Sequence, residues 1–446
     1  MILIDKFRAF QQSLSIIDKN RTFTYEDLLN EIEFYTSILV QEDVKSGDIV
    51  CLIGDYSFEA ISLFLALMLK NCIIVPIATK NESESIERIS ISKCDFIASV
   101  NEKISIKRCS DSSNSDKGNL VNELKSKGKA GLILFSSGST GKPKAMLHDL
   151  DNLVSVYADR KPKNLRFIVF LLFDHIGGLN TMLNCLSMGA TMIIPEKREP
   201  EHVAHLIEKY HVNVLPTSPT FLNLLLMSEA YKKFDLSSLL MITYGTEPMP
   251  ESLLLRLREI FPKVNFLQTF GTSETGIAKT VSKSNNSTLL KFEDENQEFK
   301  VVDGELWIRS KTQILGYLNY GNESFTQDGW FKTGDIVVRE GDFIRIIGRK
   351  KDVINVGGEK VFPQEVESVV LQLSFVTDVT AYSLPNSITG ESVGIDVVLK
   401  PEVSDVAEAK RLIRNHCKKY LESYKVPTKI NVLDAIKYSE RFKKKR

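Results

Sequence analysis

The sequence has few cysteines, no surplus of charge of either sign and no long apolar run. Its six cysteines never form a C-x-x-C pair, which excludes the common zinc and dithiol redox motifs and predicts reduced thiols in the cytoplasm. The 57 lysines and arginines balance the 57 aspartates and glutamates, so no overall field would attract nucleic acid. The longest apolar stretch, residues 60–69, is too short for a bilayer and predicts a buried helix. The N-terminus also lacks a signal-peptide pattern. From the balanced charge we expect no nucleic-acid partner, and from the short apolar stretch we expect no membrane span.

The chain has 446 residues, which is more than a single hydrophobic core usually supports, so more than one domain is expected. A capping box at Thr24 and Asp27 begins an amphipathic helix. Strand-like segments then alternate with helical ones, a pattern that predicts parallel sheets covered on both faces. The expected strands are residues 48–54, 72–77, 190–195, 212–218, 239–245 and 264–271.

The pattern changes twice further along the chain. From about residue 285 the β segments become shorter, and after residue 348 a mixed pattern begins with a helix from Pro363. We therefore predict an α/β fold with a large N-terminal domain, residues 1–348, built from βαβ-type subdomains and a small β-barrel-like subdomain over about 285–348. A small α+β C-terminal domain, residues 349–446, is expected to follow a short charged hinge.

A glycine-rich loop follows a predicted buried strand. Residues 136–144, SSGSTGKPK, combine glycines and hydroxyl residues with lysines, which suits a polyphosphate because backbone N–H groups and cations converge on it. A Walker A loop reads G-x-x-x-x-G-K-[ST]. With Gly141 and Lys142 as its G-K pair, the chain has Ser136 and Pro143 at the outer positions. We therefore predict a phosphate loop of another architecture.

Six motifs occur in order along the chain. They are LFSSGSTGKPKAMLH, TYGTEPMP, QTFGTSETG, GELWIRS, WFKTGD and GRKKDVINVGGEKVFPQEVE. Together they resemble the motifs of the adenylate-forming enzymes, which include acyl- and aryl-CoA synthetases, nonribosomal peptide adenylation domains and luciferases. The resemblance runs nearly end to end, to Arg446.

The resemblance implies a two-step reaction. A carboxylate attacks the α-phosphate of ATP to give an acyl adenylate and pyrophosphate, and a thiol of CoA or of phosphopantetheine then displaces AMP. Negative charge accumulates on phosphate oxygens, so lysines, fixed donors and Mg²⁺ would stabilise it.

The resemblance also implies which residues bind ATP. The phosphate loop would supply Ser136, Ser137, Gly138, Ser139, Thr140, Gly141, Lys142 and the catalytic Lys144. Adenine would lie against Gly245, Thr246, Glu247 and Phe270, the last at a position where the family more often has tyrosine. The same motif would supply Gly271, Thr272, Ser273 for the α-phosphate and Glu274 for Mg²⁺ and catalysis.

Asp335 would accept both ribose hydroxyls, since a carboxylate accepts two hydrogen bonds, with help from Arg349. At the C-terminus, aligning Arg446 with the family's arginine makes Lys443 the catalytic lysine. Phe442 then replaces the usual glycine, which leaves Lys444 as an alternative.

The resemblance also implies that the C-terminal domain presents a different face to the active site in each of the two reaction steps. We expect it to pivot at Lys351 and to bring Gly358 to the thiol tunnel in the second step. A residue without a side chain would let a pantetheine arm pass.

The segment FDHIGGLN resembles the acid-pocket motif of acyl-CoA synthetases, with His175 as the gate. The expected pocket consists of His175, Gly177, Gly178 and Tyr244, and its glycines could admit a longer acyl chain. Ile176 stands where amino-acid-activating relatives place an aspartate, which favours an acid without an amino group. A register shifted by two would instead put Asp174 there.

Three functions stay open at this point. The favoured one is an ATP-dependent acid–CoA ligase whose substrate is a small-molecule carboxylic acid. The second is an adenylation enzyme that loads a carrier protein, and the third is a non-catalytic, nucleotide-dependent scaffold.

Overall fold

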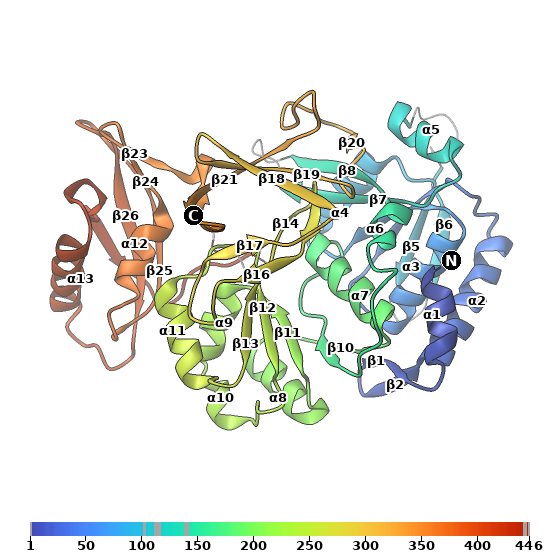
Figure 1. The fold of residues 1–446 in the computed structure, drawn as a ribbon, viewed down its shortest axis with the longest axis horizontal. Helices are drawn as coiled ribbons and strands as arrows, with labels where there is room; N and C mark the ends of the chain where they lie inside the picture. The colour runs from blue at the N-terminus through green and yellow to red at the C-terminus, as the bar shows by residue number, and fades with distance from the viewer. Residues whose placement is uncertain (1, 101–103, 111–116, 138–141, 440–443, 445–446) are drawn as a thin grey trace.

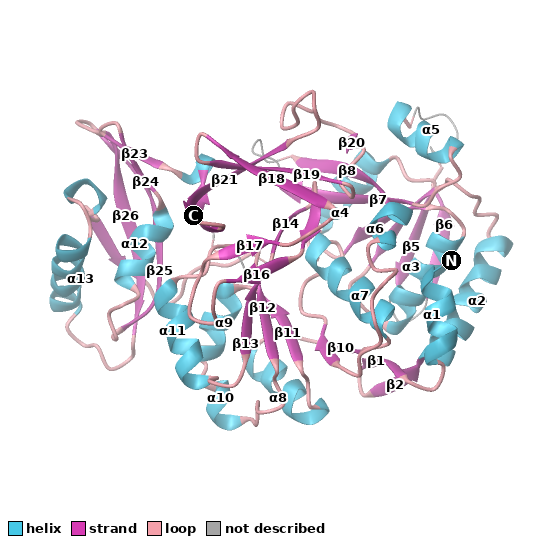
Figure 2. Cartoon of the chain, in the orientation of Figure 1, coloured by secondary structure: helices cyan, strands magenta, loops and turns pink. Residues whose placement is uncertain are grey.

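Sheets with parallel centres and helices packed against them make up the larger, N-terminal part of the molecule (Figure 1). The computed structural model describes residues 2–100, 104–110, 117–137, 142–439 and 444. Figure 2 shows helices and strands alternating through this part, and a smaller mixed domain beyond it. The predicted fold class is confirmed: an α/β N-terminal domain, a β-rich sheet and a small α+β C-terminal domain.

The first sheet has the strand order β20-β8-β7-β4-β3-β5-β6. Its strands are β3 (Ile49–Ile53), β4 (Ile73–Ile77), β5 (Phe96–Val100), β6 (Ile104–Arg108), β7 (Gly131–Ser137), β8 (Pro143–Asp149) and β20 (Gly316–Tyr317). The helices between them are α3 (Phe58–Leu69), α4 (Glu82–Ser92), α5 (Asn119–Ser126) and α6 (Leu150–Ser155). The centre pairs in parallel, whereas β6, β8 and β20 add antiparallel edges.

Both faces of this sheet are buried. Along β7, Leu132 and Leu134 enter one hydrophobic core, while Ile133 and Phe135 enter another. Side chains alternate across a strand, so a strand covered on both sides reads as an unbroken apolar run.

The second sheet has the order β13-β12-β11-β9-β10-β1-β2. Its strands are β1 (Leu14–Asp18), β2 (Arg21–Thr24), β9 (Arg166–Ile168), β10 (Thr191–Ile194), β11 (Val214–Thr217), β12 (Met241–Tyr244) and β13 (Asn265–Gln268). The accompanying helices are α1 (Ile2–Phe10), α2 (Tyr25–Gln41), α7 (Ile176–Met188), α8 (Pro200–Tyr210), α9 (Pro219–Met227), α10 (Ala230–Lys233) and α11 (Glu251–Ile260). All its strands pair in parallel except the edge strand β2.

A β-rich sheet links these layers to the C-terminal domain. A short ribbon, β14 (Phe270–Thr272) and β15 (Gly276–Ala278), precedes it. The β-rich sheet consists of β16 (Thr280–Ser282), β17 (Leu290–Phe292), β18 (Gln297–Val302), β19 (Glu305–Ser310), β21 (Phe331–Glu340) and β22 (Phe343–Arg349). It starts before residue 285, and β22 crosses the expected domain boundary at 348.

The C-terminal domain has a core of its own. Its strands are β23 (Ile354–Val356), β24 (Glu359–Val361), β25 (Val376–Asn386), β26 (Gly390–Leu399) and β27 (Lys429–Val432), with helices α12 (Pro363–Val370) and α13 (Val406–Tyr420). Short 3-10 turns occupy Lys350–Asp352 and Ser423–Lys425.

Local sequence signals explain several of these elements. The capping box that begins α2 is present: Asp27 N donates to Thr24 Oγ1 at 3.1 Å, and Thr24 N donates to Asp27 Oδ2 at 2.7 Å. The apolar stretch 60–69 forms most of α3, which is buried along nearly its whole length. Within the described ranges, no helix is both long and apolar enough to cross a bilayer.

Candidate functional site

The carboxyl ends of β11, β12 and β13 meet at one edge of the second sheet. Thr217 pairs with Tyr244, and Tyr244 pairs with Gln268, so the three following loops leave the sheet together. Ligands bind at this edge in open α/β sheets. A cavity of about 450 Å³ lies there, between these loops, the β-rich sheet and the C-terminal domain.

Most of the residues predicted to hold the nucleoside line this cavity. They are Gly245, Thr246, Glu247, Phe270, Gly271, Asp335 and Arg349. They come from the loop after β12 and from β14, β21 and β22, which are far apart in the sequence. The predicted hinge residue Lys351 also lines the cavity.

The loop after β12 is held in a defined conformation. A side chain at Gly245 would come within 2.7 Å of Thr269 Oγ1, so only glycine fits there. Thr246 has φ +72°, a left-handed conformation that is uncommon for a residue with a side chain. Glu247 accepts a hydrogen bond from Thr220 N at 2.7 Å. These contacts hold the loop against the cavity.

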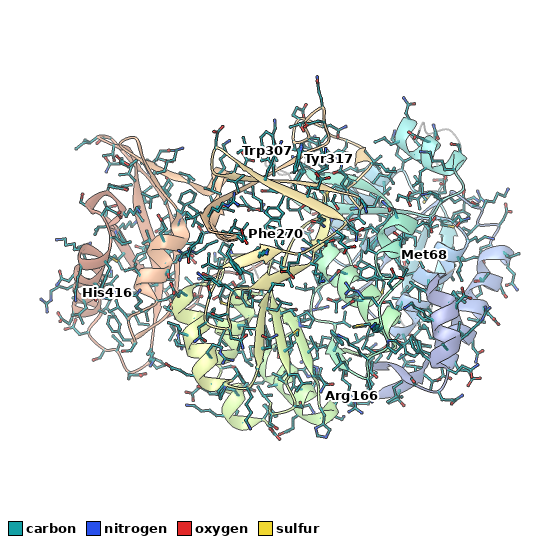
Figure 3. The ribbon with its side chains drawn as sticks, in the orientation of Figure 1. Met68, Arg166, Phe270, Trp307, Tyr317 and His416 are labelled. Atoms are coloured by element: carbon teal, nitrogen blue, oxygen red, sulfur yellow. The ribbon has the colours of Figure 1, made fainter. Side chains whose placement is uncertain are left out.

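Phe270 lies between the cavity and the β-rich sheet. Its ring meets Phe292 edge to face, with centroids 5.6 Å apart, and it also lines the cavity. Figure 3 shows it near the centre of the molecule. An aromatic ring that is held by a neighbouring ring and also lines a cavity suits base stacking.

Asp335 and Arg349 face each other across β21 and β22. Arg349 Nε donates to Asp335 Oδ1 at 3.0 Å, and Asp335 is buried while Arg349 is half exposed. The arginine therefore orients the carboxylate at the cavity wall.

The phosphate loop connects two antiparallel strands. β7 and β8 pair over their full lengths, with Ser136 opposite Lys144. A P-loop joins a strand to a helix, so this segment is not a Walker A loop, and phosphate binding by it stays a prediction. Four predicted residues, Gly138 to Gly141, lie outside the described residues; Lys142 is exposed and Lys144 is half-buried.

The predicted metal residue Glu274 lies in the turn between β14 and β15. Tyr317 Oη donates to its Oε1 at 3.0 Å. Ser273 and Glu274 are half-buried, whereas Thr272 is buried and bonded to Thr275. Thr272, Ser273 and Glu274 do not line the cavity described above.

Glu274 fits a magnesium ion that is shared with ATP. Among the described residues, no cluster of three acidic, histidine or cysteine ligands exists. Mg²⁺ usually takes one or two protein carboxylates and completes its shell with phosphate oxygens and water. A single half-buried carboxylate next to the phosphate loop therefore suits that ion.

Two neighbouring C-terminal lysines were the alternatives for the catalytic position. Lys443 lies outside the described residues. Lys444 lines the cavity, and its Nζ lies 2.9 Å from Asp378 Oδ1 and 2.6 Å from Val379 O. Burial alone would lower the pKa of Lys444, but Asp378 and Glu367 outweigh it and raise that pKa.

A second cavity, of about 400 Å³, adjoins the first and separates α9 and α11 from α12. Lys444 and Glu247 line both cavities. Asn223 Nδ2 donates to Thr377 O at 3.1 Å, from α9 to the C-terminal domain. The two domains therefore meet directly beside the site.

The predicted acid-pocket residues lie at the start of α7 and in β12. His175 is the N-cap of α7, and its Nδ1 accepts from Gly177 N at 3.1 Å. Tyr244 is buried, and burial raises the pKa of its hydroxyl. None of the four predicted pocket residues lines either cavity.

The two glycines are needed for packing. A Cβ at Gly178 would lie 2.1 Å from Leu172 O, and one at Gly177 would lie 2.8 Å from Leu171 Cδ1. The chain itself fills this space, so these glycines do not indicate room for a longer acyl chain.

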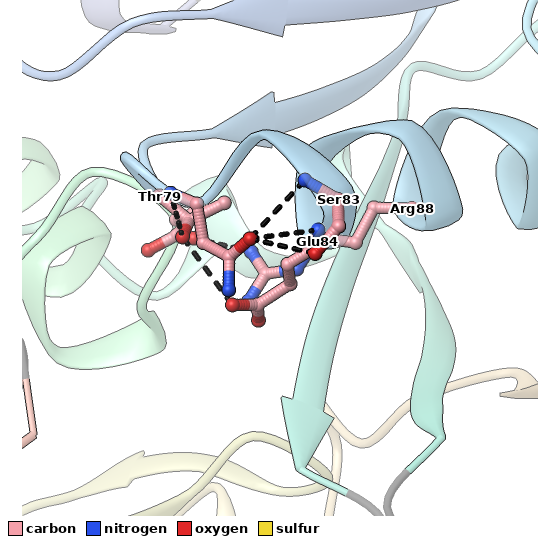
Figure 4. A network of polar contacts seen from close by, with 6 residues as sticks. Thr79, Ser83, Glu84 and Arg88 are labelled. Atoms are coloured by element: carbon pink, nitrogen blue, oxygen red, sulfur yellow. Dashed lines mark hydrogen bonds and ion pairs between the residues drawn. The ribbon is translucent and has the colours of Figure 1, made fainter.

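Asp174 is engaged by an arginine. Arg88 Nη1 lies 2.5 Å from Asp174 Oδ2, and both side chains are almost fully buried. Arg88 also pairs with Glu84, one turn earlier on α4 (Figure 4). A carboxylate that is already paired does not need a substrate ammonium, which weakens the amino-acid alternative.

Gly358 lies on the turn between β23 and β24. Its φ is +94°, and no atom lies within 4 Å of the position a Cβ would take. It does not line the cavities. A tight turn therefore accounts for this glycine in the present arrangement.

Some residues at the site carried no usable sequence signal. Gln268, Thr269, Asp352, Gln364 and Ser439 line the cavity. The first four lie inside quoted motifs, but no role was predicted for any of the five. Tyr317, Asn319 and Tyr320 approach Lys144 from a segment remote in the sequence. Only the pairing of β20 with β8 reveals this.

Family models match most of the chain. A model described as AMP-binding enzyme matches residues 5–318, and one described as AMP-binding enzyme C-terminal domain matches residues 365–443. A 4-coumarate–CoA ligase-like protein of Arabidopsis thaliana is 30% identical over 335 residues, which cover 68% of this chain and 58% of that protein. A long-chain-fatty-acid–CoA ligase of Haemophilus influenzae is 29% identical, with the same two shares. The chain thus spans about 58% of the length of these relatives.

Solved structures share the whole fold. An anthranilate CoA ligase in complex with anthranoyl-AMP has a TM-score of 0.84 at 20% identity, covering 99% of this chain and 94% of that one. An o-succinylbenzoate CoA synthetase of Bacillus subtilis in complex with its acyl-adenylate has a TM-score of 0.78 at 22% identity, covering 99% and 96%. At this identity the likeness establishes the fold.

Proposed function

The chain belongs to the family of AMP-binding enzymes, and from that premise we propose that it is an acid–thiol ligase that activates a carboxylic acid with ATP. The acceptor we infer is CoA. The observation that carries this proposal is the cavity of about 450 Å³, which is lined by Phe270, Asp335, Arg349 and Lys351 together. CoA-ligase relatives support the choice of reaction, and the free cysteine thiols are compatible with a reducing, cytoplasmic location.

In the first step, a carboxylate oxygen of the acid forms a bond to the α-phosphorus of ATP. The bond from that phosphorus to the bridging oxygen breaks, and pyrophosphate leaves. Lys144 and the donors of the phosphate loop would hold the β- and γ-phosphates, Ser273 the α-phosphate and Asp335 the ribose. Charge that develops on phosphate oxygens meets groups fixed in advance, which is the main source of rate in such transfers.

Glu274 would hold the magnesium ion. When bound, that ion neutralises phosphate oxygens and orients the triphosphate. Lys443 would neutralise the carboxylate and α-phosphate from the C-terminal side.

In the second step, the thiol loses its proton and the sulfur attacks the acyl carbon. The carbon–oxygen bond to the phosphate breaks and AMP leaves. We infer that the C-terminal domain turns about Lys351 between the steps and brings Gly358 to the thiol. The domain boundary near residues 348–349 belongs to this proposal.

The acid is inferred to lack an amino group. Arg88 already neutralises Asp174, and Ile176 at the other candidate position is buried and apolar. A buried ammonium at this place would lack a counter-ion.

The test is pyrophosphate release from ATP with a panel of aryl, short-chain and long-chain carboxylic acids. We expect release that depends on one class of acid, and no release from amino acids. An ATP analogue with a non-hydrolysable β–γ bond should still react. Lys144→Ala is the control variant, and it should slow release by about 10²–10³-fold at an unchanged melting temperature.

The acceptor is tested in the same assay. CoA, a holo-carrier protein and a simple amine are offered to the preformed adenylate. Thioester formation with CoA supports the proposal, whereas transfer only to the carrier or to the amine contradicts the choice of CoA. A parent protein that releases no pyrophosphate with any acid contradicts the proposed ligase activity.

A further inference from the structure

The segment Gly316–Tyr320 lies against the strand that carries Lys144. β20 pairs with β8, with Tyr317 opposite Met146. Asn319 holds the backbone on both sides of the lysine: its Nδ2 donates to Pro143 O at 2.8 Å, and its Oδ1 accepts from Ala145 N at 2.9 Å. One remote side chain therefore fixes the backbone at Lys144.

Two tyrosine rings of this segment face the ammonium of Lys144. Its Nζ lies 4.6 Å from the ring centroid of Tyr320 and 5.8 Å from that of Tyr317. A cation over an aromatic face within about 6 Å is attracted to it and loses freedom. Within the described part of the chain, no acidic side chain pairs with Lys144, so the two rings direct the lysine without neutralising its charge.

The same Tyr317 reaches the predicted metal carboxylate. Its hydroxyl donates to Glu274 Oε1 at 3.0 Å, and Ile314 N donates to the Glu274 carbonyl at 2.8 Å. Tyr317 is buried, with 7% of its surface exposed. Its position is therefore set by packing.

We propose that Tyr317 is a positioning residue that couples metal binding to phosphate binding, because its hydroxyl orients Glu274 while its ring helps to hold Lys144. This inference rests on the proposed function, in which Glu274 binds Mg²⁺ and Lys144 binds phosphate. A carboxylate with one oxygen bonded to a fixed hydroxyl presents its other oxygen in one direction. Mutation of a residue that hydrogen-bonds to a metal ligand commonly lowers metal affinity or activity by about 10–100-fold.

The experiment measures ATP affinity by calorimetry, with and without Mg²⁺ and without any acid. Tyr317→Phe keeps the ring and removes the hydroxyl. We expect metal-free ATP affinity to stay near that of the parent, while the gain caused by Mg²⁺ falls by about tenfold or more. Tyr320→Leu should weaken ATP binding under both conditions, since it removes only a contact of Lys144.

Two further variants make the test specific. Tyr382→Phe is the matched control, because Tyr382 Oη donates to Asp396 Oδ1 at 2.9 Å in the C-terminal domain, away from the site. It should bind Mg·ATP like the parent. Glu274→Gln should lose the Mg²⁺ gain, and adding Tyr317→Phe to it should cost little more, since both changes act on one interaction.

A Tyr317→Phe protein that keeps the full Mg²⁺ gain would overturn the proposal. Additive losses in the double variant would overturn it as well, and so would an equal loss in Tyr382→Phe. These outcomes are separate from a failure of the ligase assignment, in which the parent binds Mg·ATP but releases no pyrophosphate with any acid.

Discussion

At the scale of single residues, Lys444 is bound by partners within the C-terminal domain. Lys444 contacts Asp378 and Val379, and the hydroxyl of Tyr438 donates to the same carboxylate. Asp378 is fully buried. An ammonium held by these partners would have to leave a buried carboxylate before it could meet a substrate, so Lys444 is better suited to anchoring the C-terminal segment.

The two lysines should therefore have different phenotypes. Lys444→Met removes one partner of a buried pair, and we expect a loss of about 3–5 kcal/mol of stability. Asp378→Asn added to Lys444→Met should recover part of that loss, because it removes the unpaired charge. Lys443→Ala should melt like the parent yet lose pyrophosphate release. Melting curves measure the stability of each variant, and single-turnover assays measure its pyrophosphate release. If Lys444→Met kept its stability but lost pyrophosphate release, and Lys443→Ala kept its release, Lys444 would be the catalytic lysine.

At the scale of elements, β8 joins the phosphate loop to the core. Lys144 lies near one end, and His148, near the other, is fully buried. Burial lowers the pKa of His148 to about 4, because the charged imidazolium would be desolvated. This strand therefore carries a neutral imidazole near one end and Lys144 near the other.

The buried imidazole makes stability depend on pH. In the unfolded chain a histidine has a pKa of about 6.5, so between pH 6.5 and 4 the unfolded state binds more protons than the folded one. Stability should therefore fall as the pH drops through this window, by up to about 3 kcal/mol from this group.

His148→Gln should flatten that part of the stability profile, measured by denaturant titration at several pH values. His205→Gln, at an exposed position on α8, serves as the control and should leave the profile unchanged. Identical profiles for parent and His148→Gln would show that other groups cause any acid sensitivity.

At the scale of the whole molecule, the site is assembled where two domains meet. Figure 1 shows the C-terminal domain beside the β-rich sheet. The contact between Asn223 and Thr377 and the shared lining of the cavities join the domains in this arrangement. Gly358 lies away from the cavities, so its proposed role requires the domain to turn.

A pair of glycines tests that movement. Gly358 and Gly341 both occupy turns with positive φ, +94° and +63°, and neither has an atom near its Cβ position. Leucine at either place should strain the turn by a similar amount, about 1–3 kcal/mol. Gly358→Leu should form the adenylate but transfer it to CoA at least about tenfold more slowly, whereas Gly341→Leu should transfer normally. Equal transfer rates in both variants would exclude Gly358 from the thiol path.

Sequence alone was sufficient for the family and for many of the strands and helices. The alternation of strands and helices, the capping box at Thr24 and the unbroken apolar run of β7 follow from local physics, because periodicity and capping act within a few residues. The six ordered motifs predicted that Asp335 and Phe270 bind the nucleoside, and both residues line one cavity; their binding role stays a prediction.

Only the tertiary structure decided which groups meet. Tyr317 and Asn319 reach Lys144 from a segment that begins far along the chain, through the pairing of β20 with β8. Arg88 neutralises Asp174 through the packing of α4, and Leu172 fills the space beside Gly178. Such contacts depend on how strands and helices pack over long sequence separations, and no local pattern encodes them. Residue types therefore predicted the kind of chemistry, while the pairing of distant elements determined which side chains position the predicted site residues.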